Sequence, residues 1–138
     1  MNVDLLFKAL IVLAPVMVLV VVLFRLDSHR LLGTHFIGWM FLAGGVSAVT
    51  CSFLNAVMLE QAGVDFVWYT RFAAPVVEEV LKAGILVYLF RTHRIGFLID
   101  AGIIGFTVGA GFSFVENIYY LHQAHDAHYG VWMVRGFG

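Results

Sequence analysis

Two adjacent glutamates, Glu78 and Glu79, lie inside an apolar stretch that is long enough to cross a membrane. Placing a carboxylate in hydrocarbon costs at least ~2.5–3.5 kcal/mol even on the mildest insertion scales, and ionisable residues at such positions are typical of functional sites. A desolvated glutamate beside a cation can act as a general base for water near neutral pH. Glutamates from two helices can also hold a metal ion that generates hydroxide.

A lysine follows the pair at helical spacing. Lys82 is four residues after Glu78 and three after Glu79, so on a helix it can neutralise one of them. Adjacent residues point about 100° apart, so both glutamates cannot face the same point. We expect one to face a cavity and the other to pair with Lys82 or a neighbouring helix. The simpler alternative is a buried Glu78–Lys82 ion pair, with Glu116 satisfied by Asn117 or a backbone group.

The composition is that of an integral membrane protein. Of 138 residues, 62% are hydrophobic and 12% are charged, whereas soluble domains are about half apolar and a quarter charged. The net charge of −1 gives no indication of a nucleic-acid partner. The single cysteine, Cys51, excludes an intrachain disulfide, and we interpret it as a small packing residue.

Four segments have the ~20 mostly apolar residues that a membrane helix needs. They cover roughly residues 5–24, 36–59, 72–90 and 97–121. The sequence therefore predicts an all-α polytopic transmembrane helical bundle, a single membrane domain over residues 1–138. A fifth helix could begin near Tyr129, and the chain ends at Gly138 without room to complete it, so we expect either a short protein or one truncated at its C-terminus.

The basic residues of the short loops indicate the orientation. Arg25 and Arg30 follow the first span, and Arg91 and Arg94 follow the third, so both basic loops lie on one side. Cytoplasmic loops carry the excess of Lys and Arg. We therefore expect an N-terminus outside and basic loops in the cytoplasm, in a bacterial-type inner or plasma membrane. Lys8, near the outer end of the first span, fits this orientation less well.

The same topology places carboxylates from two spans at one depth. Glu78 and Glu79 lie about six residues inside the third span, ~9 Å below its outer edge. Glu116 lies about five residues before the fourth span ends, ~8 Å deep. We expect one cluster in the outer leaflet. Its excess negative charge must be balanced by protons, a metal or a missing arginine.

Histidines beyond the fourth span are candidate metal ligands. His122 lies six residues after Glu116, and His125, Asp126 and His128 follow it closely. On a continued helix several of them would share one side, where they could bind zinc. The alternative is a polar loop at the membrane interface.

Two further features have simpler interpretations. Asp100 is ~24 Å from the glutamates along a helix, so we expect it to pair with Arg91 or Arg94 or to lie at a helix start, where negative charge is favourable. Gly105 and Gly109 form a small-xxx-small pattern. Such residues let membrane helices approach closely, and we expect them to pack the fourth span on the third or to form a dimerisation face.

The two carboxylate segments resemble the motifs of a known family. Residues 78–82, Glu-Glu-Val-Leu-Lys, resemble the Glu-Glu-x-x-Lys motif of the PrsW family of intramembrane metalloproteases. Residues 112–117, Phe-Ser-Phe-Val-Glu-Asn, resemble its second motif, Phe-x-x-x-Glu followed by Asn. The related CAAX-protease and bacteriocin-processing group has Glu-Glu-x-x-x-Arg and Phe-x-x-x-His instead, so Lys82 and Glu116 favour PrsW. The resemblance covers roughly residues 75–121.

This resemblance implies a membrane-embedded peptidase that cuts a membrane-anchored protein substrate in or beside the lipid bilayer, for example an anti-sigma-factor-like regulator. Either member of the glutamate pair would be the base that activates water. Glu116 would be a second catalytic group or a metal ligand, joined by His122 at a possible zinc site. Lys82, Asn117 and Phe112 would support the site. The family pattern continues with a histidine on a later helix, which residues 1–138 do not reach.

Two other function classes remain open. Intramembrane carboxylates also form proton relays, so the chain could be a component of a proton-coupled transporter, and such a relay would use Asp100 with the glutamates. Alternatively, the chain is a non-catalytic membrane subunit of the same fold that docks a partner.

Overall fold

The computed structural model describes residues 3–26, 33–63, 65–94 and 98–123, and these residues are helical almost throughout. The elements in chain order are α1 (Val3–Leu26), α2 (Thr34–Ala62), the short α3 (Phe66–Trp68), a π-helical turn η1 (Tyr69–Ala73), α4 (Ala74–Arg91) and α5 (Leu98–Gln123). The predicted all-α class is confirmed for the described residues. His125, Asp126, His128 and the start of the predicted fifth helix lie outside them.

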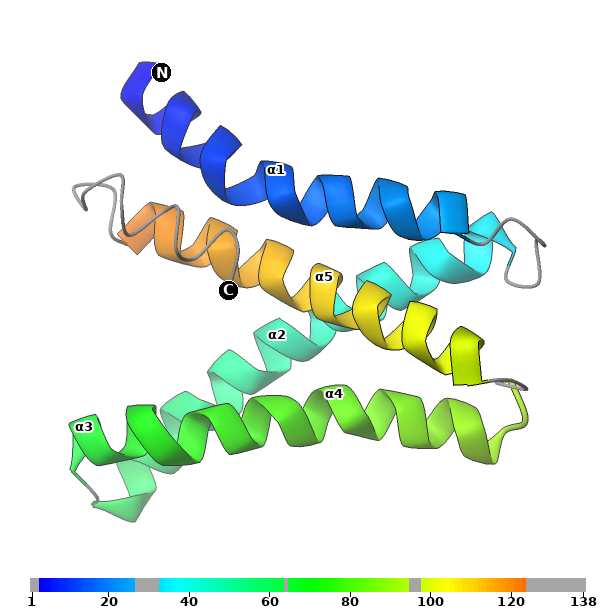
Figure 1. Ribbon diagram of the computed structural model, residues 1–138. Coiled ribbons are helices and arrows are strands. Elements are labelled where there is room, and N and C mark those ends of the chain that lie inside the picture. The colour runs from blue at the N-terminus through cyan, green and yellow to red at the C-terminus, as the bar shows by residue number, and fades with distance from the viewer. Residues whose placement is uncertain (1–2, 27–32, 64, 95–97, 124–138) are drawn as a thin grey trace.

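Helix α5 lies at the centre of the arrangement. Figure 1 shows α5 between α1 and α4 and running opposite to both, while α2 crosses diagonally behind them. The most extensive helix contact is between α5 and α2, and α1 and α4 add smaller contacts with α5. The helix that carries Glu116 is therefore held by all three of the other long helices.

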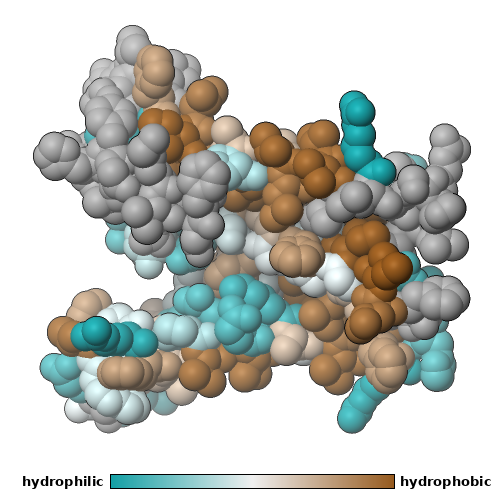
Figure 2. Space-filling model, in the orientation of Figure 1, coloured by the Kyte–Doolittle hydropathy of each residue, from teal (hydrophilic) through white to brown (hydrophobic). Residues whose placement is uncertain are grey.

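The outer surface of the bundle is apolar. Only 22% of the apolar window of α2 and 39% of that of α5 is buried inside the protein. Apolar side chains cover much of the face drawn in Figure 2, and a hydrophilic patch lies over the middle of it. Large exposed apolar patches mark membrane or protein contacts rather than a soluble surface. These helices therefore suit a lipid environment.

Two of the four predicted spans qualify by length and composition among the described residues. These are His35–Gln61 and Leu98–Gln123, whereas α1 contributes a shorter apolar stretch, Phe7–Val22. Helix α4 has 18 residues and contains both glutamates of the pair and Lys82, which lowers its hydropathy. The number of spans therefore stays a prediction beyond α2 and α5.

Two glycines allow α2 and α5 to approach closely where they cross. A Cβ atom at Gly44 would collide with the backbone carbonyl of Val108 on α5, and a Cβ atom at Gly111 would collide with the backbone carbonyl of Phe41 on α2. Small residues at such reciprocal positions let two helix backbones touch. This contact was not predicted, because the glycine pattern around Gly105 was expected to pack the fourth span on the third or to form a dimerisation face.

The predicted glycine contact with the third span is looser than expected. A Cβ atom at Gly105 would lie 3.6 Å from a methyl group of Leu86 on α4, an ordinary van der Waals distance. Helices α4 and α5 instead meet through larger side chains. One buried cluster joins α2, α4 and α5 near the basic end of α4. A second cluster consists of Ala48, Cys51 and Phe112, with Val77, Leu81 and Val115 packed against it.

The third helical segment begins earlier than predicted. Helix α2 ends at Ala62 and is capped by Gly63, which has φ +58°. Asp65 then caps α3 by accepting a 2.9 Å hydrogen bond from the backbone N–H of Trp68. The π turn η1 follows, and Pro75 lies in the first turn of α4. Proline lacks an N–H donor, and its ring clashes with the carbonyl four residues earlier in a regular α-helix. The wider turn directly before Pro75 eases this conflict.

Candidate active site

A pocket of about 290 Å³ opens between α2, α4 and α5. Glu78 from α4 and Glu116 from α5 both line it, so the structure brings together the carboxylates that the topology placed at one depth. The other lining residues come from α2 and α5 and are Ala48, Val49, Cys51, Ser52, Asn55, Phe112, Val115, Tyr119 and Tyr120. The pocket is therefore a partly polar cavity within an apolar bundle.

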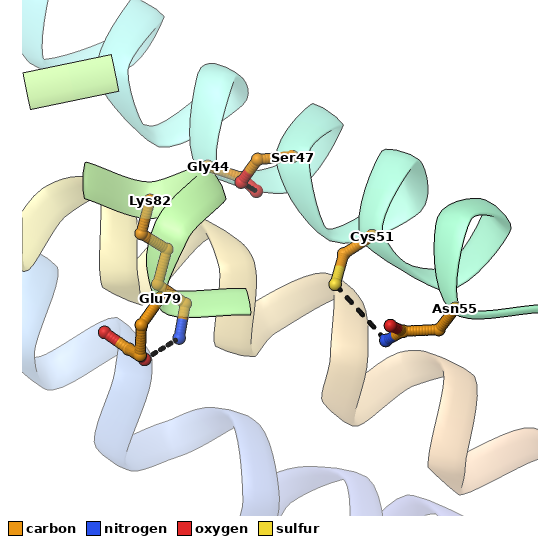
Figure 3. A network of polar contacts seen from close by, with 6 residues as sticks. All are labelled: Gly44, Ser47, Cys51, Asn55, Glu79 and Lys82. Atoms are coloured by element: carbon orange, nitrogen blue, oxygen red, sulfur yellow. Dashed lines mark hydrogen bonds and ion pairs between the residues drawn. The ribbon is translucent and has the colours of Figure 1, made fainter. Parts of the chain in front are cut away.

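The other member of the glutamate pair faces away from the pocket. The Glu79 side chain is 73% exposed, and its Oε1 accepts a 2.8 Å hydrogen bond from the Lys82 ammonium group. Figure 3 shows this ion pair on α4, apart from the polar pair on α2. The adjacent glutamates thus divide as helical geometry required, with Glu78 at the pocket and Glu79 on the lysine.

The same lysine contacts the second motif. Its Nζ lies 4.2 Å from the centre of the Phe112 ring on α5, and this ring is buried and lines the pocket. A cation over an aromatic face is attracted by the quadrupole of the ring. Lys82 therefore connects Glu79 on its own helix to the pocket wall on the next.

Helix α2 supplies a polar wall that the sequence analysis did not identify. Cys51, Ser52 and Asn55 all line the pocket. The Asn55 amide donates to the Cys51 sulfur at 3.4 Å, as drawn in Figure 3, and its oxygen accepts a 2.9 Å hydrogen bond from the buried hydroxyl of Tyr69 in η1. The available signal was the presence of Ser52 and Asn55 one turn apart in an otherwise apolar span.

A buried lysine lies at the same end of the bundle. Lys8 is only 7% exposed on α1. Helix α1 runs opposite to α5, so its N-terminal turns lie level with the C-terminal part of α5, where Glu116 is found (Figure 1). Lys8 fits the orientation expected from the loop charges less well because it is buried in the bundle and does not belong to a loop.

The remaining predicted site residues lie around the pocket or far from it. Asn117 is 4% exposed, and within the described part of the chain its Nδ2 has no hydrogen-bond partner. His122 is exposed in the last turn of α5 and is not among the residues that line the pocket. Asp100 is buried in the first turn of α5, ~24 Å along the helix from Glu116.

The described residues do not complete a metal site. Catalytic zinc sites use three protein ligands and keep one open position. The pocket offers the two carboxylates Glu78 and Glu116, and among residues 3–26, 33–63, 65–94 and 98–123 no group of three or more His, Cys, Asp or Glu could hold a metal. A metal here would need at least one ligand from the rest of the chain.

Comparison with known proteins gives one result. A family model described as PrsW family intramembrane metalloprotease matches residues 29–138, which include α2, α4, α5 and both glutamate segments. No curated protein and no solved structure matches the chain. The match covers well over half of the sequence, and it coincides with the helices that build the pocket.

Proposed function

Because the chain belongs to the PrsW family of intramembrane metalloproteases, we propose that it is a peptidase that hydrolyses a peptide bond of a membrane-anchored protein. An anti-sigma-factor-like regulator is a substrate of the expected kind. The observation that carries the proposal is the shared pocket of Glu78 and Glu116, which come from different helices and face one cavity.

Glu78 is the proposed general base. Its carboxylate takes a proton from a water molecule, and the water oxygen attacks the carbonyl carbon of the scissile peptide bond. The proton then passes to the amide nitrogen, the C–N bond breaks, and a new carboxylate and a new amine are formed. Glu79 is not assigned this step, because its carboxylate is held by Lys82 and points away from the pocket.

Glu116 is the proposed second catalytic group. In the same cavity as Glu78, its carboxylate would hold the group that stabilises the negative charge developing on the carbonyl oxygen. The buried ring of Phe112 keeps water out of this side of the pocket.

A divalent metal, zinc in the simplest case, is the cofactor that the family description implies. Bound metal lowers the pKa of its water and polarises a carbonyl group. Glu116 is the proposed ligand within the described residues. His122 begins ~9 Å further along α5 and about 240° around it, so the remaining ligands are more easily supplied by residues after Gln123.

The proposed setting is a four-span bundle in a bacterial-type plasma membrane, with the N-terminus outside. In that orientation the pocket lies in the outer leaflet. Glu116 lies seven residues before the end of α5, and Glu78 lines the same pocket, so both carboxylates lie at a similar depth.

The test is cleavage of a single-span reporter protein by the purified protein in liposomes. We expect the Glu78→Gln and Glu116→Gln variants each to lose at least ~100-fold in rate, the lower range of general acid–base contributions. Glu60→Gln is the matched control, because Glu60 is an exposed carboxylate in the last turn of α2 and does not line the pocket.

Thermal unfolding of each variant in detergent separates loss of chemistry from loss of fold. Full cleavage by both pocket variants would refute the proposed mechanism. Equal losses in Glu60→Gln would show that the assay responds to surface charge rather than to the pocket.

A further inference from the structure

We propose that a groove between α4 and α5, at the opposite end of α4 from the glutamates, binds an anionic phospholipid. The groove has a volume of about 390 Å³ and is lined by Leu86, Val87, Phe90, Arg91 and Ala101. Arg91 is 13 residues after Glu78, ~20 Å along the helix. The groove is therefore separate from the candidate active site and does not depend on proteolysis.

The walls of the groove suit an acyl chain. Four of its five lining residues are apolar. Phe90 is 70% exposed and Val87 is 52% exposed, although both belong to a packed helix pair. A hydrocarbon chain in the groove would cover apolar surface of both helices.

The cationic end of the groove suits a phosphate group. Arg91 is the last residue of α4 and lines the groove, and Arg94, which does not line it, follows three residues later in the turn after the helix. Both side chains are exposed, and within the described residues neither guanidinium group forms an ion pair. The backbone N–H of Arg94 donates to the carbonyl of Leu89 at 3.0 Å, which fixes this turn against the end of the helix.

The combination of an apolar groove and two arginines favours a lipid over its possible rivals. A free phosphate would use the arginines but leave the apolar groove uncovered. A second copy of the chain would bring its own cations to the same place. Anionic lipids are attracted to juxtamembrane arginines, and basic pockets between membrane helices hold their head groups.

The test is lipid retention by the purified protein, measured by native mass spectrometry after titration with phosphatidylglycerol or phosphatidylcholine. We expect the wild type to prefer phosphatidylglycerol. Arg91→Gln and Arg94→Gln should each weaken its binding about fivefold, the effect of one basic residue near an anionic surface. Arg71→Gln is the matched control, because Arg71 is an exposed arginine at the other end of the same helical segment.

A second variant tests the groove itself. Ala101→Phe should lower the retention of both lipids, because the larger ring fills the cavity, and the oligomeric state should stay unchanged. Equal losses in Arg71→Gln and Arg91→Gln, or equal binding of the two lipids, would overturn the proposal. Dissociation of a dimer by Ala101→Phe, or displacement of the lipid by millimolar inorganic phosphate, would overturn it in favour of another occupant.

Discussion

The ammonium group of Lys82 lies 4.2 Å from the centre of the Phe112 ring, across the contact between α4 and α5. The two residues belong to the two glutamate segments and are separated by 30 positions in the sequence. Because the same ammonium group also binds Glu79 at 2.8 Å, one lysine orients the outward glutamate and contacts a wall of the pocket that holds Glu78.

Removal of this contact should weaken the packing of α4 on α5. We expect Lys82→Met and Phe112→Leu each to destabilise the protein, with a coupling energy of about 0.5–2 kcal/mol in the double variant, the usual size of a cation–π contact. The measurement is denaturant unfolding in detergent of the wild type, both single variants and the double variant. Strictly additive effects would show that the two side chains do not interact.

The two glutamates of the pair should differ in their effect on cleavage. Glu79→Gln keeps the shape of the side chain and weakens only an exposed ion pair, which contributes little to stability. We expect its cleavage rate to stay within about tenfold of the wild type, while Glu78→Gln falls by ~100-fold or more. The reporter assay in liposomes measures both. The reverse order would assign the base to Glu79.

The crossing of α2 and α5 should tolerate no added methyl group at its centre. Gly44→Ala and Gly111→Ala each place a Cβ atom against a backbone carbonyl, and overpacking of this kind costs about 1–3 kcal/mol. Gly84→Ala is the matched control, because Gly84 is an exposed glycine within α4 and a Cβ atom there meets no atom within 4 Å. Thermal unfolding should separate the three variants, and equal melting temperatures would contradict the close contact.

The hydroxyl group of Tyr69 should stabilise the junction between η1 and α2. Its 2.9 Å hydrogen bond to Asn55 joins residues 14 positions apart. Tyr69→Phe removes only this hydroxyl, so we expect a loss of about 0.5–1.5 kcal/mol in unfolding free energy. Tyr88→Phe, at an exposed tyrosine on α4, should have no such effect. Equal stability of both variants would show that the hydrogen bond contributes nothing.

A substitution at Asp100 should distinguish a peptidase from a proton transporter. If the chain is a peptidase, Asp100→Asn should keep most of its cleavage rate, because this residue lies ~24 Å along α5 from Glu116. If the chain carries protons, the same variant should reduce proton flux into liposomes, since a relay across the membrane would need it. Cleavage of the reporter and quenching of a pH-sensitive dye inside the liposomes measure the two activities.

The sequence predicted the helices and the principal pair of the pocket, because both depend on local rules. Apolar length identified the helical segments, and residue counting along antiparallel helices placed Glu78 and Glu116 together. The 100° step between neighbouring helical residues also predicted that the two glutamates of the pair would point in different directions. Which of the two faces the pocket could not be predicted, because it depends on how α4 is rotated against α2 and α5.

Contacts between distant helices could not be predicted in the same way. Gly44 meets Val108, and Gly111 meets Phe41, only because α2 crosses α5 at that point. Asn55 reaches Tyr69 only through the turn that follows α2. The burial of Lys8 likewise depends on which helix packs beside α1.

The π turn before α4 determines which residue of the next helix reaches the pocket. Its i→i+5 hydrogen bonds enclose one residue more than an ordinary α-turn, so the chain from Tyr69 to α4 completes the same rotation with one extra residue. If residues 69–73 were regular α-helix, the phase of α4 would advance by one position, and the apolar Val77 would occupy the place of Glu78. The chemistry of the pocket thus depends on one extra residue in a helical turn. That turn begins at Tyr69, whose hydroxyl group is hydrogen-bonded to Asn55.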